Sequence, residues 1–109
     1  MQNVYDIAHE LVRSLKETDQ YKNYKELKAK IDGNPELVKM INDFQEKNMQ
    51  MQLSVMQGVE VDEELKQQIG SLYGIVMGDP LAAQYMQAEF SFTQVVSEIY
   101  GIIGEVAKE

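Results

Sequence analysis

One short pattern, present twice, constrains the fold of this chain more than any other feature. It occurs as Gly33-Asn34-Pro35 and again as Gly78-Asp79-Pro80, which hold both prolines of the sequence. Glycine can end a helix in the left-handed conformation, Asn or Asp can cap the next helix, and proline is favoured in a first helical turn. We therefore expect helices to end after Ile31 and after Met77, with a third break at Gly58.

Apolar residues between these breaks follow the three- and four-residue spacing of helices, and no segment shows the alternation of a strand. The expected helices cover about residues 3–16, 19–31, 35–57, 63–77 and 80–107, with Thr18 or Asp19 capping the second and Asp62 the fourth. The pattern predicts an all-α fold. We expect an antiparallel helical bundle of about five helices, two of them long, in a single self-associating domain of residues 1–109.

The apolar side of each helix is the expected core. For the first helix this side holds Val4, Ile7, Ala8, Leu11, Val12 and Leu15. For the third it holds Leu37, Val38, Met40, Ile41, Phe44, Met51, Val55 and Met56. In the fourth helix, Gly70, Gly74 and Gly78 share one side, which indicates either close packing there or a weak, mobile helix.

Composition excludes several classes of site. The chain has no cysteine, so disulfides, zinc-thiolate sites and thiol nucleophiles are absent. His9 is the only histidine, and no nucleophile or phosphate-loop motif occurs, so we expect no enzyme activity and no cofactor or metal. The acidic run of Glu60, Asp62, Glu63 and Glu64 is interpreted as helix capping rather than a cation site. No apolar run reaches the length of a membrane span, and we expect a cytoplasmic protein.

The last helix has a second side that suggests a partner. The main apolar stripe of this helix holds Leu81, Tyr85, Ala88, Phe92, Val95, Val96, Ile99, Tyr100, Ile103 and Val106. The second side consists of small or apolar residues that lie off this stripe: Ala83, Met86, Phe90, Ser97, Gly101 and Gly104. Glycine costs about 1 kcal/mol relative to alanine inside a helix, so close approach of another helix would explain the two glycines. The alternative is that the C-terminal turns fray. We expect a homodimer through this side, and Met49 and Leu53, which lie off the stripe of the third helix, are further candidates for a partner surface.

Net charge argues against nucleic acid as a general partner, with one exception. The chain carries 10 basic and 18 acidic residues, a formal charge of −8, which disfavours anionic partners. The second helix nevertheless places Lys22, Lys25 and Lys28 beside two tyrosines. This patch is either a solvated helix face or a contact for RNA phosphates and bases.

Several short motifs in order along the chain resemble those of a known family. They are Tyr5-Asp6-x-Ala8 with Leu11 and Leu15, Tyr21 and Tyr24, Asn34-Pro35 with Phe44, Met56-x-Gly58-x-Glu60-Val61, Met86-x-Ala88-Glu89, and the apolar tail from Ile99 to Ile103. In these the chain resembles the YheA/YmcA/YlbF family of small helical bacterial proteins, most closely the short YheA-like members.

The resemblance implies an all-α, cytoplasmic, self-associating bacterial protein. YlbF and YmcA members act in a complex that influences ribonuclease Y, competence, sporulation and biofilm formation, and their cysteines are tied to iron–sulfur clusters. This chain has no cysteine, so the iron–sulfur role does not carry over. We expect a non-enzymatic protein-interaction or regulatory protein that acts as a homodimer. The alternatives are an RNA-binding accessory factor in RNA decay or processing, or a subunit of such a regulatory complex.

Overall fold

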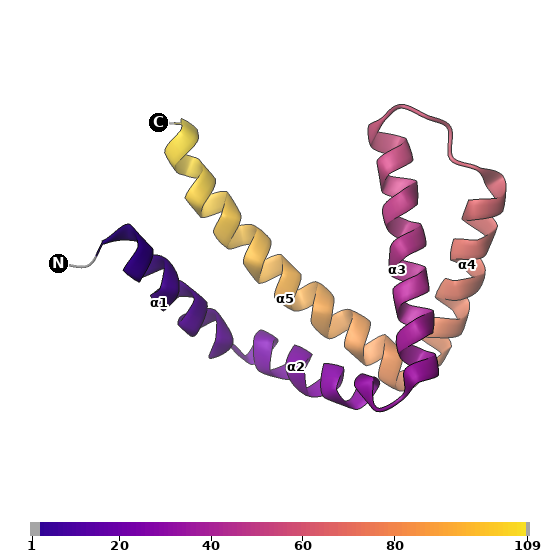
Figure 1. Ribbon diagram of the computed structural model, residues 1–109, viewed down its shortest axis with the longest axis horizontal. Helices are drawn as coiled ribbons and strands as arrows, with labels where there is room; N and C mark the ends of the chain where they lie inside the picture. The colour runs from indigo at the N-terminus through magenta and orange to yellow at the C-terminus, as the bar shows by residue number, and fades with distance from the viewer. Residues whose placement is uncertain (1–2, 109) are drawn as a thin grey trace. The chain divides into compact units, whose positions relative to one another are not determined.

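The computed structural model describes residues 3–108, most of which lie in helices joined by short connections (Figure 1). Five α-helices follow one another, and a 3-10 turn, η1, ends the described chain. Their bounds are α1 Val4–Lys16, α2 Asp19–Asp32, α3 Pro35–Met56, α4 Glu63–Gly78, α5 Pro80–Gly104 and η1 Glu105–Lys108. Residues 3–108 contain no strand, and none of their helices is long and apolar enough to cross a membrane. The prediction of an all-α fold with five helices, two of them long, is confirmed.

In both copies of the Gly-Asn/Asp-Pro pattern, the residue before proline caps the following helix, as predicted. Asn34 caps α3 by accepting a hydrogen bond from the Leu37 N–H at 3.3 Å. Asp79 caps α5 by accepting from the N–H groups of Leu81 and Ala82, at 3.0 and 3.1 Å. Asp62 likewise accepts from the Glu64 N–H at the start of α4. The capping interpretation of the acidic run therefore holds at Asp62.

The prediction that Gly33 and Gly78 end the preceding helices in the left-handed conformation is wrong. Among the described glycines only Gly58 has a positive φ, of 73°, so Gly33 and Gly78 are not in the left-handed conformation. The bend is made by the capping residues, because a residue before proline is pushed into extended backbone. Asn34 has φ −126° and ψ 92°, and Asp79 has φ −94° and ψ 118°.

Residues 30–84 form one compact unit, built around the hairpin of α3 and α4. The two helices lie side by side and run in opposite directions, joined by residues 57–62 (Figure 1). Leu37, Ile41 and Phe44 are buried on α3, and Val76 is fully buried on α4. The ring of Phe44 lies 6.0 Å from that of Tyr73. The far end of the α3 stripe differs from the prediction, because Val55 and Met56 are exposed.

The other compact unit combines residues 3–29 with residues 85–108. Four aromatic rings join α2 to α5: Tyr24 stacks on Tyr85 at 5.8 Å and on Phe92 at 5.7 Å, and Tyr21 meets Phe92 edge-on at 5.4 Å. Tyr85 is buried, and its hydroxyl is hydrogen-bonded with Glu89 and Tyr24. Burial, with a smaller contribution from these bonds, raises the pKa of Tyr85 well above its ordinary value of 10.0.

The prediction that the first helix buries its apolar side is also wrong. No residue of α1 is buried, and Val4 is 71% exposed, with Ile7 and Val12 also exposed. Leu11 and Leu15 are half-buried. Helical spacing shows which side of α1 is apolar, but it does not guarantee that the same chain supplies the surface that covers it. The single-domain organisation of residues 1–109 stays a prediction.

The glycines of α4 and the loop should respond to substitution with opposite signs. A Cβ at Gly74 meets nothing within 4 Å, so Gly74→Ala should stabilise the protein by about 1 kcal/mol through helix propensity. Gly58→Ala should destabilise it by about 1 to 2 kcal/mol, because alanine is strained at a φ of 73°. Denaturant unfolding measures both. A loss of stability in Gly74→Ala would show that α4 is packed closely against a partner molecule.

The shifted pKa of Tyr85 predicts a loss of stability in alkali. Because the folded-state pKa lies above the unfolded value near 10, the unfolded state ionises first. Stability should fall above pH 10, by up to about 1.4 kcal/mol per pH unit from this group. Tyr85→Phe should show a shallower fall between pH 10 and 11.5 in denaturant unfolding, and Tyr5→Phe, at an exposed tyrosine, should keep the wild-type slope. Equal slopes in all three proteins would contradict the assignment.

Candidate interaction surfaces

One side of α5 has a stretch that the described chain leaves open. The predicted residues divide in two: Ala83 and Met86 are half-buried, whereas Phe90, Ser97, Gly101 and Gly104 are exposed. Phe90 is 70% exposed, and a Cβ at either glycine would meet nothing within 4 Å. Their role in an interface remains a prediction, and the open stretch runs from Phe90 to Gly104.

A second exposed apolar stripe lies on α3. Met49 and Leu53 are exposed as large hydrophobic side chains, and Met56 is 82% exposed. Positions 49, 53 and 56 are spaced four and three residues apart, so they share one side of the helix. Sequence reasoning assigned Met56 to the core, and its exposure extends the candidate surface by one turn. Methionine side chains adapt to partners of varied shape.

The lysine patch of α2 is placed on the surface, but its tyrosines are engaged elsewhere. Lys22 and Lys25 are exposed and Lys28 is half-buried. Tyr21 and Tyr24 pack their rings against Phe92 and Tyr85 of α5. Rings held in this way are not a platform for stacking RNA bases. The patch therefore offers positive charge for phosphates without aromatic stacking.

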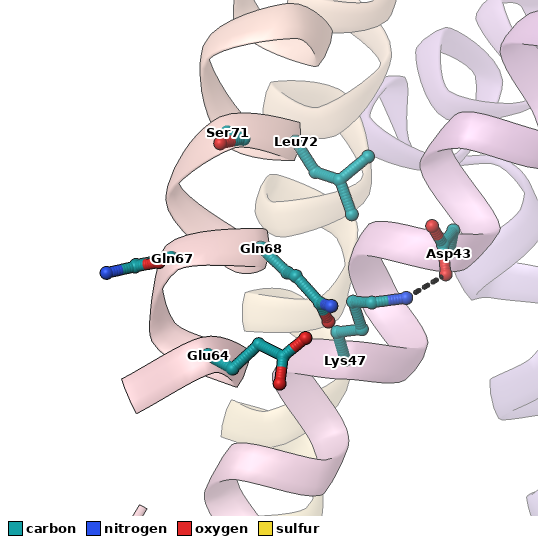
Figure 2. A pocket seen from close by; sticks show the side chains of 7 residues that line it. All are labelled: Asp43, Lys47, Glu64, Gln67, Gln68, Ser71 and Leu72. Atoms are coloured by element: carbon teal, nitrogen blue, oxygen red, sulfur yellow. Dashed lines mark hydrogen bonds and ion pairs between the residues drawn. The ribbon is translucent and has the colours of Figure 1, made fainter. Parts of the chain in front are cut away.

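Sequence reasoning did not identify a polar hollow between α3 and α4, with a volume of about 550 Å³ (Figure 2). Its lining residues are Asp43, Lys47, Glu64, Gln67, Gln68, Ser71 and Leu72. Figure 2 shows Gln68 reaching from α4 toward Lys47, while Gln67 points away. The only sequence signal for this hollow is the four-residue spacing of Asp43 and Lys47 on α3 and of Glu64 and Gln68 on α4.

The chemistry of this hollow is that of a polar surface. The Nζ of Lys47 lies 2.6 Å from the Oδ1 of Asp43, so its charge is already neutralised within α3. The pair is partly exposed, and such pairs contribute little to stability. The lining contains no histidine or cysteine to act as base or nucleophile. Across residues 3–108 no group of acidic, histidine or cysteine side chains is placed to hold a metal ion.

Comparison with known proteins finds similarity along almost the whole chain. A family model described as "Control of competence regulator ComK, YlbF/YmcA" matches residues 4–106. A UPF0342 protein of Symbiobacterium thermophilum is 38% identical over 102 residues, which cover 94% of this chain and 91% of that protein. A UPF0342 protein of Staphylococcus epidermidis is 36% identical over 101 residues, which cover 93% of this chain and 89% of that protein.

A solved structure shares the fold. It is a protein of unknown function (DUF964) from Bacillus stearothermophilus, with a TM-score of 0.77 and 12% sequence identity. The match covers 99% of this chain and 95% of that one. At this level of identity the likeness concerns the fold alone. On the family model and the relatives above 30% identity, the chain belongs to the YlbF/YmcA family, which is described as controlling the competence regulator ComK.

Proposed function

We propose that this chain is a non-enzymatic cytoplasmic protein that acts as a homodimer and regulates other proteins by binding them. The observation that carries the proposal is the exposure of Phe90 on a side of α5 whose members one turn away, Met86 and Gln94, carry no charge. Burying a phenylalanine side chain is worth about 1.5 to 3 kcal/mol, so a ring that is 70% exposed favours association. A twofold symmetric dimer is the simplest assembly that covers the same side on both copies.

The family supports a regulatory role over a catalytic one. Its description names control of a competence regulator, and the two relatives described above have names that state no activity. We propose that the chain works in the same manner, as a subunit of a regulatory complex. The exposed side of α3 with Met49, Leu53 and Met56 is the proposed surface for the regulated partner, separate from the dimer surface on α5.

A charge placed at Phe90 should break the dimer. Phe90→Asp puts a carboxylate where the partner's apolar surface would cover it, and a buried unpaired charge is strongly unfavourable. Native mass spectrometry should then change from twice the chain mass of 12.5 kDa to the single chain. Ser91→Asp, at an exposed residue that points about 100° around the helix from Phe90, is the matched control and should remain dimeric. A wild-type protein of single-chain mass would refute the homodimer.

RNA binding is the alternative function, and exposed Lys22 and Lys25 are the observation in its favour. The charge of −8 and the packed rings of Tyr21 and Tyr24 weigh against it. If this alternative holds, filter retention of a single-stranded RNA at low salt should be lost in Lys22→Glu/Lys25→Glu, because phosphate contacts are electrostatic. Lys39→Glu, at an exposed lysine of α3, is the control. We expect no retention even for the unmodified protein.

A further inference from the structure

The exposed apolar side of α3 continues into the connection that follows the helix. Met49, Leu53 and Met56 share this side, and Val59 in the connection to α4 is exposed like them. Leu53 is nine residues from Phe44, about two and a half helical turns, so the two side chains point in opposite directions. The ring of Phe44 faces α4, and α4 therefore lies on the other side of the helix. We call the four exposed residues the methionine stripe.

The charge around the methionine stripe is negative. Residues 43–66 include six acidic and two basic residues, a net charge of −4. Lys47 is paired with Asp43 at 2.6 Å, and Lys66 with Glu63 at 3.3 Å, so each lysine is already matched within its own helix. The four charges in excess are all acidic and all exposed: Glu46, Glu60, Asp62 and Glu64.

This combination of apolar surface and negative charge selects the kind of partner. We propose that the methionine stripe binds a basic amphipathic helix of another protein. The apolar side of that helix lies on the stripe, and its lysine or arginine side chains face Glu46 at one end and Glu60 at the other. The part of α3 from Glu46 to Met56 is about 15 Å long, which matches about three turns of the partner helix. The inference rests on the partner surface proposed above for α3 and adds the chemistry of the partner.

The chemistry of the stripe fits this partner better than a second copy of the chain. Methionine side chains adapt to apolar side chains of varied shape, as they meet along the apolar side of a helix. Among α1 to α5 only α2 has more basic than acidic residues. Its apolar side is already used, since Leu27 and Ile31 are buried and Tyr21 and Tyr24 pack on α5. A second copy therefore has no basic helix with a free apolar side.

Two synthetic peptides test the chemistry with the full-length protein. Each has about 14 residues, with leucines at helical spacing along one side; the other side is all lysine in one peptide and all glutamate in the other. Fluorescence anisotropy of the labelled peptides at low salt should show binding of the lysine peptide and at least about 10-fold weaker binding of the glutamate peptide, because juxtaposed like charges are costly. Binding of the lysine peptide should weaken in about 1 M sodium chloride, where charges are screened beyond about 3 Å.

Four variants locate the binding site of the lysine peptide. Leu53→Gln should weaken binding about 10-fold by removing an apolar contact, and Ile75→Gln, at an exposed apolar residue of α4, is the matched control. Glu60→Lys should weaken binding about 5-fold, because an attraction becomes a repulsion. Glu36→Lys makes the same change of net charge about 30 Å along α3 from Met56 and should bind as the wild type does. Circular dichroism should show equal helix content in all four variants.

The outcomes separate this inference from the function on which it rests. Equal losses in Glu60→Lys and Glu36→Lys, or no loss in Leu53→Gln, would show attraction by net charge alone and overturn the inference. Binding of the glutamate peptide that is lost in Leu53→Gln would overturn the basic partner and leave α3 as the partner surface. Binding of neither peptide would overturn both. A dimer that Leu53→Gln converts to a single chain in native mass spectrometry would place a second copy on the stripe and overturn the inference.

Discussion

The aromatic packing of α2 on α5 decides which sides of the last helix are available. Tyr24 lies between Tyr85 and Phe92, and Tyr21 meets Phe92 from the edge. These contacts fix the rotation of α5 about its own axis, since its buried residues in this unit, Tyr85 and Ala88, lie on the same side. Phe90 is two residues from Phe92 and is consequently turned away from α2. The exposure of the stretch from Phe90 to Gly104 follows from this packing.

The sequence was most informative about where helices begin and which side of each is apolar. Proline and a capping Asn or Asp act locally, so Asn34 and Asp79 could be assigned from neighbouring residues alone. The glycines before them were misjudged because the extended backbone of the capping residue already turns the chain. Helical spacing also placed Phe90, Gly101 and Gly104 off the main stripe of α5. All three are exposed, but so are Tyr100 and Ile103 of that stripe, so their role in an interface stays a prediction.

Whether the apolar side of a helix is buried depends on the other helices of the molecule, and this could not be predicted from the sequence. The stripe of α1 has the same spacing as that of α3, yet α1 has no buried residue while α3 buries Leu37, Ile41 and Phe44. The hollow at Asp43 and Lys47 was missed for a related reason. It arises where α4 brings Glu64 and Gln68 beside α3, and only the local pairs within each helix are visible in the sequence.

The uncovered side of α1 has a consequence for the thermodynamics of this protein. A helix whose large apolar residues, Val4, Ile7 and Val12, remain in water gains little from tertiary burial, and isolated helices of about this length are marginal in water. Any molecule that covers this side binds the folded form and not the unfolded one, so it shifts the folding equilibrium by mass action. The fraction of molecules in which the N-terminal helix is folded therefore depends on the concentration of the molecule that covers its apolar side.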